Sequence, residues 1–527
     1  MSKIIFITGG VVSGIGKSST TASIGRLFKS RGYDVRLLKM EPYFNVDTRH
    51  MSPLQHGEVY VTDDGEETDM CIGHYERMLG RRMRAGSNVT TGQVYWEVLS
   101  RERRGDYDGG TVQVIPHITN MIKEHIYRAA EDTDILIVEI GGTVGDIESQ
   151  PFIEAIREVS VESGLHDTAF VHVTLAPYIP SSGELKSKPT QHSVKELLGG
   201  GVQPDVLICR TERPMDDSMK SKIVLFCNMR PQDVIACDYA ENEYELPLML
   251  NKAGLVEALE YHLRLEHRDA DLKAWEEMIG KIRGAVGEVT VGIVGNYVNM
   301  RDAYHSVFEA LAHGGFENGV NVSINWISTK DVAEKGAAAA VYGCDGIVSV
   351  GGLREDGFDQ FVEVSRYARE CGMPFLGIDI GMQAAAVDIA RNIIGMTGAG
   401  STEFGECDAV IDAITDENGK KKFLIGAEKC VIEPNTRAAA VYGAESVSER
   451  NRCKYVLSPA FARIFNEAGV QFSMVSEDGD AVEAIEIPAH RWFMATQFLP
   501  QFTSRPNHPH PIIVDFVREL KAQNNNK

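Results

Sequence analysis

Long apolar runs and excess positive charge are both missing from this chain. No apolar stretch in the 527 residues reaches the roughly 18 residues that a membrane-spanning helix needs. The opening residues, MSKIIFITGG, predict a buried strand rather than a signal peptide. The 53 Lys and Arg face 75 Asp and Glu, which leaves a net charge of −22 and argues against binding to nucleic acid or an anionic membrane. We therefore expect a cytoplasmic protein in which a local group of cations holds any anionic ligand.

Paired cysteines are also missing. The nine Cys residues form no CxxC pair and are scattered among apolar segments, which is typical of reduced core thiols rather than of a disulfide framework. The apolar content of 43% and the charged content of 24% are ordinary for a globular protein. A chain of this length predicts two to four domains, each with its own core.

Both halves of the chain alternate short β-branched runs with amphipathic helical stretches, which predicts parallel α/β sheets. A charged helical connector at 265–288 separates the two series. We therefore predict a domain at 1–266, a linker at 267–287 and a second domain at 288–522. The segments that we expect to form strands are 3–10, 34–40, 134–142, 169–177 and 204–211 in the first half, and 289–298, 344–352, 373–381 and 493–502 in the second.

The first predicted strand leads into a glycine-rich turn, TGGVVSGIGKSSTTASIGRLF. Such a turn points backbone N–H groups at an anion at the start of the following helix. Lys17 would reach the β- and γ-phosphates, and Ser18 could approach a magnesium ion. One more residue separates Gly10 from Gly16 than GxxxxGK[ST] allows, so the turn is a variant P-loop or, alternatively, a purely structural turn.

Two further polar segments could complete a site around this loop. The stretch EIGGTVGDIESQPF places Glu139 at a strand end and two more acids, Asp146 and Glu148, in the next loop, where oxygen ligands suit magnesium. The stretch SGELKSKPTQHSVKEL brings Lys186 and Lys188 close together, which could clamp a second phosphorylated ligand. Solvated loops would explain either segment taken alone.

The second half carries a strand, a sharp turn and a helix in FLGIDIGMQ, residues 375–383. This geometry lifts a nucleophile above a parallel sheet, and Cys or Ser is expected at its apex. The sequence has Asp379 there. The site therefore has either unusual chemistry or none.

With these pieces in place, the chain resembles the CTP synthases over nearly its whole length. The motifs that carry the likeness are KMEPYFNVD, MSPLQHGEV, GHYERML, RRGDYDGGTVQVIPHITN and KPTQHSVKEL. The resemblance implies an α/β fold with an N-terminal P-loop-type, dethiobiotin-synthetase-like parallel sheet domain (the amidoligase) and a C-terminal class I glutamine amidotransferase-like domain. It also implies a homotetramer that phosphorylates O4 of UTP with ATP and Mg²⁺ and then aminates it.

Site residues follow from the resemblance by position. It implies that Lys17 and Lys39 face the transferring phosphoryl group and that Glu139 binds the metal. The implied ATP contacts are Gly14, Ile15, Gly16, Lys17, Ser18, Ser19, Arg210, Asp238, Tyr239 and Ala240. The implied UTP or CTP contacts are Ser13, Asp146, Ile147, Glu148, Lys186, Ser187, Lys188, Pro189, Thr190, Gln191 and Lys222. The implied ammonia passage is lined by Pro53, His56 and Val59.

The chain departs from the family pattern at the metal site. The family's ETDLDLGHYER reads ETDMCIGHYER here, so Cys71 replaces an aspartate that would bind magnesium. Magnesium strongly prefers oxygen to sulfur. We therefore expect metal binding at this position to be weakened or rearranged, with Asp69 as a substitute if the loop shifts.

The departures at the glutaminase site are larger. Asp379 stands at the nucleophile position, while Leu499 and Gln501 in TQFLPQFTS take the positions of the family's His and Glu. The glycine pair Gly351–Gly352 remains, but LREDG follows it, and the glutamine-pocket segment is reduced to a remnant around FLIGAEKC. A thiolate nucleophile needs a base, and the base needs an orienting carboxylate. We expect no glutaminase activity.

Three specific functions stay open on this basis, beside an unspecified acyl or phosphoryl transfer. The chain is an amidoligase that uses free ammonia on UTP or a related uracil nucleotide, an amidoligase that takes another amine or a modified pyrimidine nucleotide, or a non-catalytic nucleotide-binding regulator or assembly subunit of an active synthase. The set of Lys clamps favours catalysis, and Cys71 favours the regulator.

Overall fold

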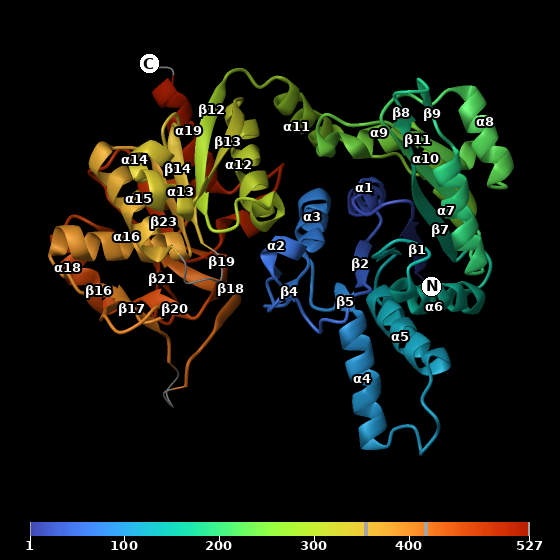
Figure 1. The fold of residues 1–527 in the computed structure, drawn as a ribbon, viewed down its shortest axis with the longest axis horizontal. Helices are drawn as coiled ribbons and strands as arrows, with labels where there is room; N and C mark the ends of the chain where they lie inside the picture. The colour runs from blue at the N-terminus through green and yellow to red at the C-terminus, as the bar shows by residue number, and fades with distance from the viewer. Residues whose placement is uncertain (1, 352–356, 416–419, 525–527) are drawn as a thin grey trace. The chain divides into compact units, whose positions relative to one another are not determined.

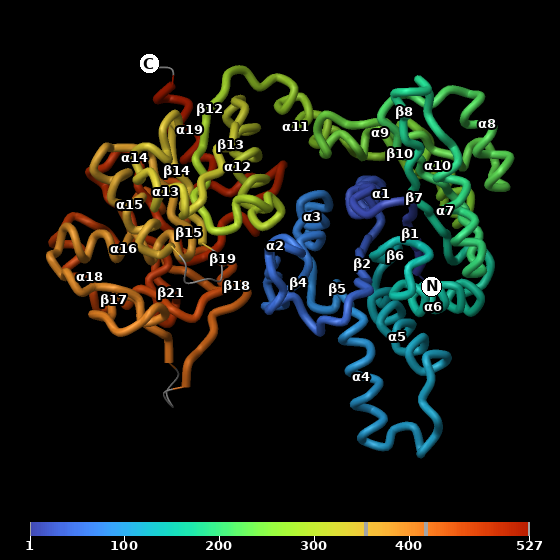
Figure 2. The backbone as a smooth tube through the Cα atoms, viewed as in Figure 1, coloured from blue at the N-terminus to red at the C-terminus, as the bar shows by residue number. Residues whose placement is uncertain are grey.

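The computed structural model describes residues 2–351, 357–415 and 420–524. They divide into two compact units, one of Met1–His50 with Cys71–Ala274 and the other of Met51–Met70 with Trp275–Lys527. Figures 1 and 2 show the elements of each unit coloured along the chain. Within the described ranges, no helix has both the length and the apolar character that crossing a bilayer would require.

The first unit is built on a parallel sheet of seven strands among the described residues. In spatial order these are β11 (Val234–Cys237), β10 (Val206–Thr211), β7 (Thr168–Ala176), β1 (Lys3–Gly9), β6 (Ile135–Ile140), β2 (Val35–Glu41) and β5 (Asn88–Thr90). The central strands are covered on both faces, so β6 is buried along its whole length and reads as a continuous apolar run around Glu139.

Helices connect and cover these strands. They are α1 (Lys17–Lys29), α3 (Met70–Leu79), α4 (Thr91–Arg104), α5 (Thr119–Ala130), α6 (Gln150–Ser163), α7 (Lys188–Gly199), α8 (Asp217–Phe226), α9 (Leu246–Lys252) and α10 (Leu255–Leu263). One core cluster joins Phe6 and Val138 of the sheet to apolar side chains of α4, α5 and α6. Because the strands are parallel, the loops after β1, β2, β6, β7 and β10 meet at one edge, where α/β sheets bind ligands.

The second unit has a mixed sheet of nine strands within its described part. In order these are β13 (Asn321–Ser328), β12 (Glu288–Gly295), β14 (Gly346–Val350), β15 (Phe375–Ile378), β23 (Phe493–Thr496), β22 (Val482–Glu486), β21 (Gln471–Ser476), β18 (Leu424–Ile432) and β19 (Ser446–Cys453). The first five are parallel and the last four join antiparallel. A smaller sheet contains β16 (Ala399–Ser401), β17 (Asp408–Ala413) and β20 (Tyr455–Leu457).

The helices of this unit are α11 (Lys273–Arg283), α12 (His305–Asn318), α13 (Thr329–Lys335), α14 (Ala337–Ala340), α15 (Phe358–Cys371), α16 (Ile380–Ile389), α17 (Arg437–Tyr442), α18 (Ala462–Glu467) and α19 (Pro511–Asn524). Its main core lies around α15 and α16, with Phe361, Met382 and Phe493 among its members. Every segment expected to be a strand contains one, and both units are α/β, as predicted. The connector is helical only over α11; residues 265–272, which also have a helical sequence pattern, do not form a helix.

Residues Met51–Met70 leave the first unit in sequence and pack with the second. We call this segment the strap. It contains the short helix α2 (Pro53–His56) and the antiparallel strands β3 (Tyr60–Val61) and β4 (Glu67–Thr68). The chain therefore passes between the units three times, at 50–51, 70–71 and 274–275.

Candidate functional site

The glycine-rich loop links β1 to α1 at the carboxyl edge of the first sheet. Gly14 and Gly16 have φ values of 70° and 86°, in the left-handed region that favours glycine, and Gly16 is the N-cap residue of α1. The Lys17 side chain runs back past Gly9, where an added Cβ would lie 2.6 Å from Lys17 Cδ, and donates to the Gly142 carbonyl. Burial and the nearby Lys39 lower the pKa of Lys17.

Glu139 is the centre of a buried polar cluster beside this loop. Its Oε1 accepts from Ser18 Oγ at 2.9 Å and from Lys39 Nζ at 2.5 Å, and its Oε2 accepts from the Tyr75 hydroxyl. The residue is 0% exposed, and although burial opposes its charge, the Lys39 ammonium lowers the pKa of Glu139. The structure thus brings Lys17, Ser18, Lys39 and Glu139 together.

Cys71 adjoins the same cluster. The Ser18 hydroxyl lies 3.2 Å from Cys71 Sγ as well as within hydrogen-bond distance of Glu139. Among the described residues, no group of three or more His, Cys, Asp or Glu side chains is arranged to hold a metal ion. Glu139 and the Ser18 hydroxyl are nevertheless the kind of partial donor set that magnesium completes with phosphate oxygens and water.

The candidate nucleotide clamps lie on the loops and helices that follow β6, β7 and β10. Lys188 is the first residue of α7, and Gln191 donates to Ser187 Oγ at 3.0 Å. Lys186 pairs with Glu184, and Lys222 lies on α8. Of the β6 loop residues, Asp146 accepts from the Thr143 amide at 3.1 Å, while Ile147 is 78% exposed.

The candidate adenine contacts lie at the ends of β10 and β11. Arg210 Nη1 is 3.0 Å from Cys237 Sγ, and Thr211 Oγ1 donates to Asp238 at 2.8 Å. Tyr239 is 72% exposed, so its ring is free to stack on a planar group. The Arg210 guanidinium comes within 3.8 Å of the place that a Cβ on Gly16 would take, so it borders the glycine-rich loop.

Sequence reasoning missed a buried histidine, His172, whose hydrogen bonds lie beneath the loop. His172 Nδ1 lies 2.8 Å from Thr8 Oγ1, and its Nε2 lies 2.7 Å from Ser193 Oγ on α7. Burial lowers the pKa of His172 to about 3, so the imidazole is neutral at physiological pH. It joins the end of β1 to the helix that carries Lys188. The role of Tyr75 was missed too, although it lies inside the motif GHYERML; no signal short of the tertiary structure indicates either contact.

In the second unit, Asp379 occupies the turn between β15 and α16 with φ 53° and ψ −111°. This backbone is the strained one that exposes a nucleophile, and Gly381 is required there because a Cβ would lie 2.0 Å from the Ser349 carbonyl oxygen. Asp379 Oδ1 accepts from Gln497 Nε2 at 2.7 Å. Burial raises the pKa of Asp379 to about 7, with a further contribution from Glu403.

The other two positions of the glutaminase triad carry different residue types, Leu499 and Gln501, and both are buried. Leu499, 7% exposed, immediately precedes the short 3-10 helix η8 (Pro500–Phe502), and Gln501, 5% exposed, lies within it. Gly351 packs against Ile380, where a Cβ would lie 2.5 Å from the Ile380 Cβ. Gly352 lies outside the described residues. The predicted passage residues Pro53, His56 and Val59 lie on the strap, in the second unit.

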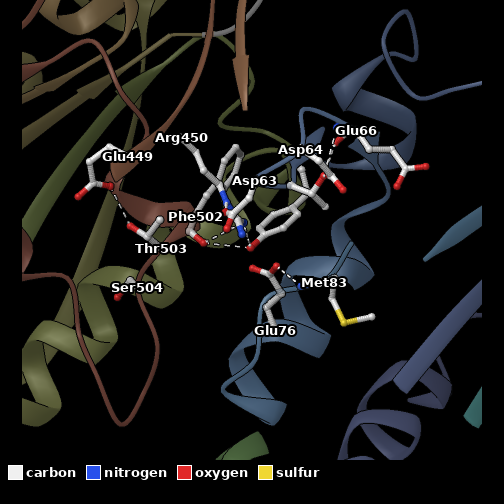
Figure 3. A network of polar contacts seen from close by, with 12 residues as sticks. Asp63, Asp64, Glu66, Glu76, Met83, Glu449, Arg450, Phe502, Thr503 and Ser504 are labelled. Atoms are coloured by element: carbon white, nitrogen blue, oxygen red, sulfur yellow. Dashed lines mark hydrogen bonds and ion pairs between the residues drawn. The ribbon is translucent and has the colours of Figure 1, made fainter. Parts of the chain in front are cut away.

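A buried arginine joins the strap to the turn that contains Gln501. Figure 3 shows Arg450 of β19 pointing between Asp63 of the strap and Phe502. Its Nε donates to Asp63 at 2.6 Å and its Nη1 donates to the Tyr60 hydroxyl at 2.7 Å. The neighbouring Glu449 accepts from Thr503 at 3.1 Å, which ties the same turn to β19 from the other side.

Comparison with known proteins shows which families and solved structures this chain is similar to. The family model described as "CTP synthase N-terminus" matches residues 3–265, and that of "Glutamine amidotransferase class-I" matches 299–519. The chain is 48% identical to a CTP synthase of Clostridium acetobutylicum and 46% identical to one of Bacillus subtilis, covering 98% of both chains in each case. Among solved structures it is similar to the glutaminase domain of Trypanosoma brucei CTPS, with 29% identity, a TM-score of 0.42 and coverage of 44% of this chain and 94% of that one.

Proposed function

This chain belongs to the CTP synthase family, and on that premise we propose that it is an ATP-dependent amidoligase that aminates UTP, or a related uracil nucleotide, with free ammonia. In the first step O4 of the uracil attacks the γ-phosphorus of ATP, N3 of the uracil loses its proton, and ADP is released. In the second, ammonia forms a bond to C4, inorganic phosphate leaves, and the new amino group loses one proton.

The observation that carries the proposal is the cluster of Lys17, Lys39, Ser18 and Glu139 at the carboxyl edge of the first sheet. Phosphoryl transfer depends on positioned cations that stabilise charge on the transferring group. Lys17, at the start of helix α1, and Lys39, near the end of strand β2, would supply two of them from different elements. The half-buried Arg210 and the exposed Tyr239, at the ends of β10 and β11, would take the adenine, and α7 with Lys222 would hold the UTP phosphates.

Magnesium fits this donor set when nucleotide is bound. Glu139 and the Ser18 hydroxyl would hold it from the protein side, and the ion would neutralise phosphate charge. Cys71 contributes no useful ligand, since thiols are poor partners for magnesium. Water is the simplest replacement in the coordination shell.

Free ammonia is proposed as the donor because Asp379, Leu499 and Gln501 occupy the positions that resemble the nucleophile, base and acid of a glutaminase. Asp379 accepts from Gln497 and has no imidazole at position 499 to relay a proton. Loss of the nucleophile together with the base and its orienting acid argues against replacement chemistry at this turn.

Cys71 supports a second candidate, a nucleotide-binding regulator or assembly subunit of an active synthase. A weakened metal site would leave nucleotide binding largely intact while slowing phosphoryl transfer.

We also propose that the protein assembles into an oligomer, because Trp96 and Leu99 of α4 are 67% and 55% exposed. Exposed apolar side chains of this size suit a subunit interface, and we propose a homotetramer with the domain limits 1–266, 267–287 and 288–522.

The test is incubation of the full chain with ATP, magnesium, UTP and ammonium, followed by mass spectrometry. ADP together with a nucleotide in which NH replaces one oxygen supports the amidoligase. Parallel reactions replace ammonium by glutamine or by other small amines, and UTP by other uracil nucleotides. Nucleotide binding without ATP turnover in any of them would leave the regulator.

A further inference from the structure

The strap is fastened to the second unit by a set of buried ionic and hydrogen-bonded contacts. We infer that Arg450 and Arg452 of β19 are positioning residues that hold the strap where ammonia use requires it. The unit would then serve the amination step as a platform although it lacks the glutaminase groups. This inference rests on the proposed ammonia-dependent function and extends it to residues outside the nucleotide sites.

The first fastening is Arg450, which is 0% exposed. Its guanidinium donates to Asp63 and to the Tyr60 hydroxyl, as described above, and Nη1 also lies 3.4 Å from the Phe502 carbonyl oxygen. A fully buried guanidinium is tolerated only where its partners are fixed, so the contacts specify one position of the strap.

The altered glutaminase turn takes part in this fastening. The Tyr60 hydroxyl donates to the Phe502 carbonyl at 3.0 Å, and the two rings pack with centroids 4.7 Å apart. The Leu499 amide donates to the Arg450 carbonyl at 2.8 Å. The turn therefore contacts the strap through Phe502 and the arginine through Leu499, and neither contact depends on a His or Glu side chain.

Two more fastenings lie on either side of Tyr60. Arg452 contacts Glu67 of β4 at 2.8–2.9 Å, and the Glu67 side chain is 1% exposed. Glu58 accepts from the Ser306 amide at 3.0 Å and from its hydroxyl, at the start of α12. Backbone contacts add to these, since the Ala427 amide donates to the Asp63 carbonyl at 2.8 Å.

In sequence, the fastened residues lie next to those for which the resemblance implies an ammonia passage. Val59 stands between Glu58 and Tyr60, and Pro53 and His56 precede them on α2. The strap ends at Met70, the first residue of α3, and Cys71 follows it beside Ser18. A shift of the strap would thus move the passage residues, and a displacement of about 1 Å can cost a hundredfold in rate.

The experiment uses the full-length chain and varies ammonium at saturating ATP and UTP. For Arg450→Met and Arg452→Met we expect the KM for ammonium to rise roughly tenfold or more, while the Kd for ATP by calorimetry stays within about twofold of the parent. Arg450→Lys, which keeps the charge, should recover part of the loss. Tyr60→Phe removes one hydroxyl and tests the same contact should Arg450→Met fail to fold.

Arg437→Met is the matched control. Arg437 also forms an ion pair in the second unit, with Asp515 at 3.1 Å, but not with the strap. A purely structural role predicts that the Arg450, Arg452 and Arg437 variants all lose kcat with an unchanged KM for ammonium, and that result would overturn the inference. Absence of ammonia-dependent turnover in the parent chain would instead refute the proposed function.

Discussion

Replacing Asp379 by Asn should stabilise the protein at neutral and alkaline pH. The structure puts a carboxyl group in a desolvated turn with a pKa of about 7, against a usual value of 3.8. Between these values the folded state holds a proton that the unfolded state has released, so the free energy of unfolding falls as the pH rises. Above pH 7 the carboxyl group is ionised in both the folded and the unfolded state, so the full cost of burying its charge lowers the free energy of unfolding.

The magnitude follows from the size of the shift. Each pKa unit corresponds to about 1.4 kcal/mol, so the full shift of about three units sets an upper bound of about 4 kcal/mol. Because Asp379 keeps some exposure, about 2–3 kcal/mol is a more realistic gain for Asn. Gln497 can accommodate the new amide, since its unpartnered, buried Oε1 accepts from Asn after the Gln497 amide is flipped.

The assay is denaturant unfolding of the parent and the Asp379→Asn variant at pH 5.5, 7 and 8.5. Between pH 5.5 and the raised pKa near 7, about half of that gain, roughly 1–1.5 kcal/mol, should appear. Asp388→Asn is the matched control on α16, the helix that follows Asp379, because Asp388 is buried and paired with Arg369 at 2.9 Å. That control should lose stability at each pH. A gain from Asp379→Asn that is absent, or equal at pH 5.5 and 8.5, would refute the reasoning.

Three further predictions concern the two sites. Glutamine should release no glutamate above the buffer blank, and Asp379→Cys should not recover activity because Leu499 supplies no base; measurable glutamate from the parent would contradict this. Lys17→Ala should weaken ATP binding by roughly ten- to a hundredfold, or about 1.5–3 kcal/mol, through loss of a charge-assisted contact, and calorimetry that finds equal affinity would rule out the site. Cys71→Asp adds an oxygen ligand and should lower the magnesium concentration for half-maximal ATP turnover; loss of an existing activity would instead give the thiol a role of its own.

The two α/β series and the family were readable from the sequence because their signals are local. Apolar runs such as KIIFITG predict strands wherever they occur, and the glycine-rich turn with Lys17 needs only its neighbours to be recognised. The altered residues at 379, 499 and 501 were equally visible, since each stands inside a short motif. The hydrogen bond from Gln497 to Asp379, and the raised pKa of Asp379, follow from packing.

The ends of the connector show the opposite case. Residues 265–288 have a charged helical pattern throughout, yet the helix begins only at Lys273. Local propensity is a weak signal where solvent competes for the backbone. Tertiary contacts fix that boundary, as shown by the Asp271 amide, which donates to the Ser30 carbonyl of the first unit at 2.8 Å.

By itself the sequence determined the fold class, the order of the two α/β series and the residue types available for chemistry, because each depends on short-range pattern. Only the tertiary structure decided which partners those residues meet. It placed Tyr75 on Glu139, His172 between Thr8 and Ser193, and the strap in the second unit on Arg450. Asp63 and Arg450 are 387 positions apart. A contact between residues so far apart depends on how the sheets pack, and no local sequence pattern predicts it.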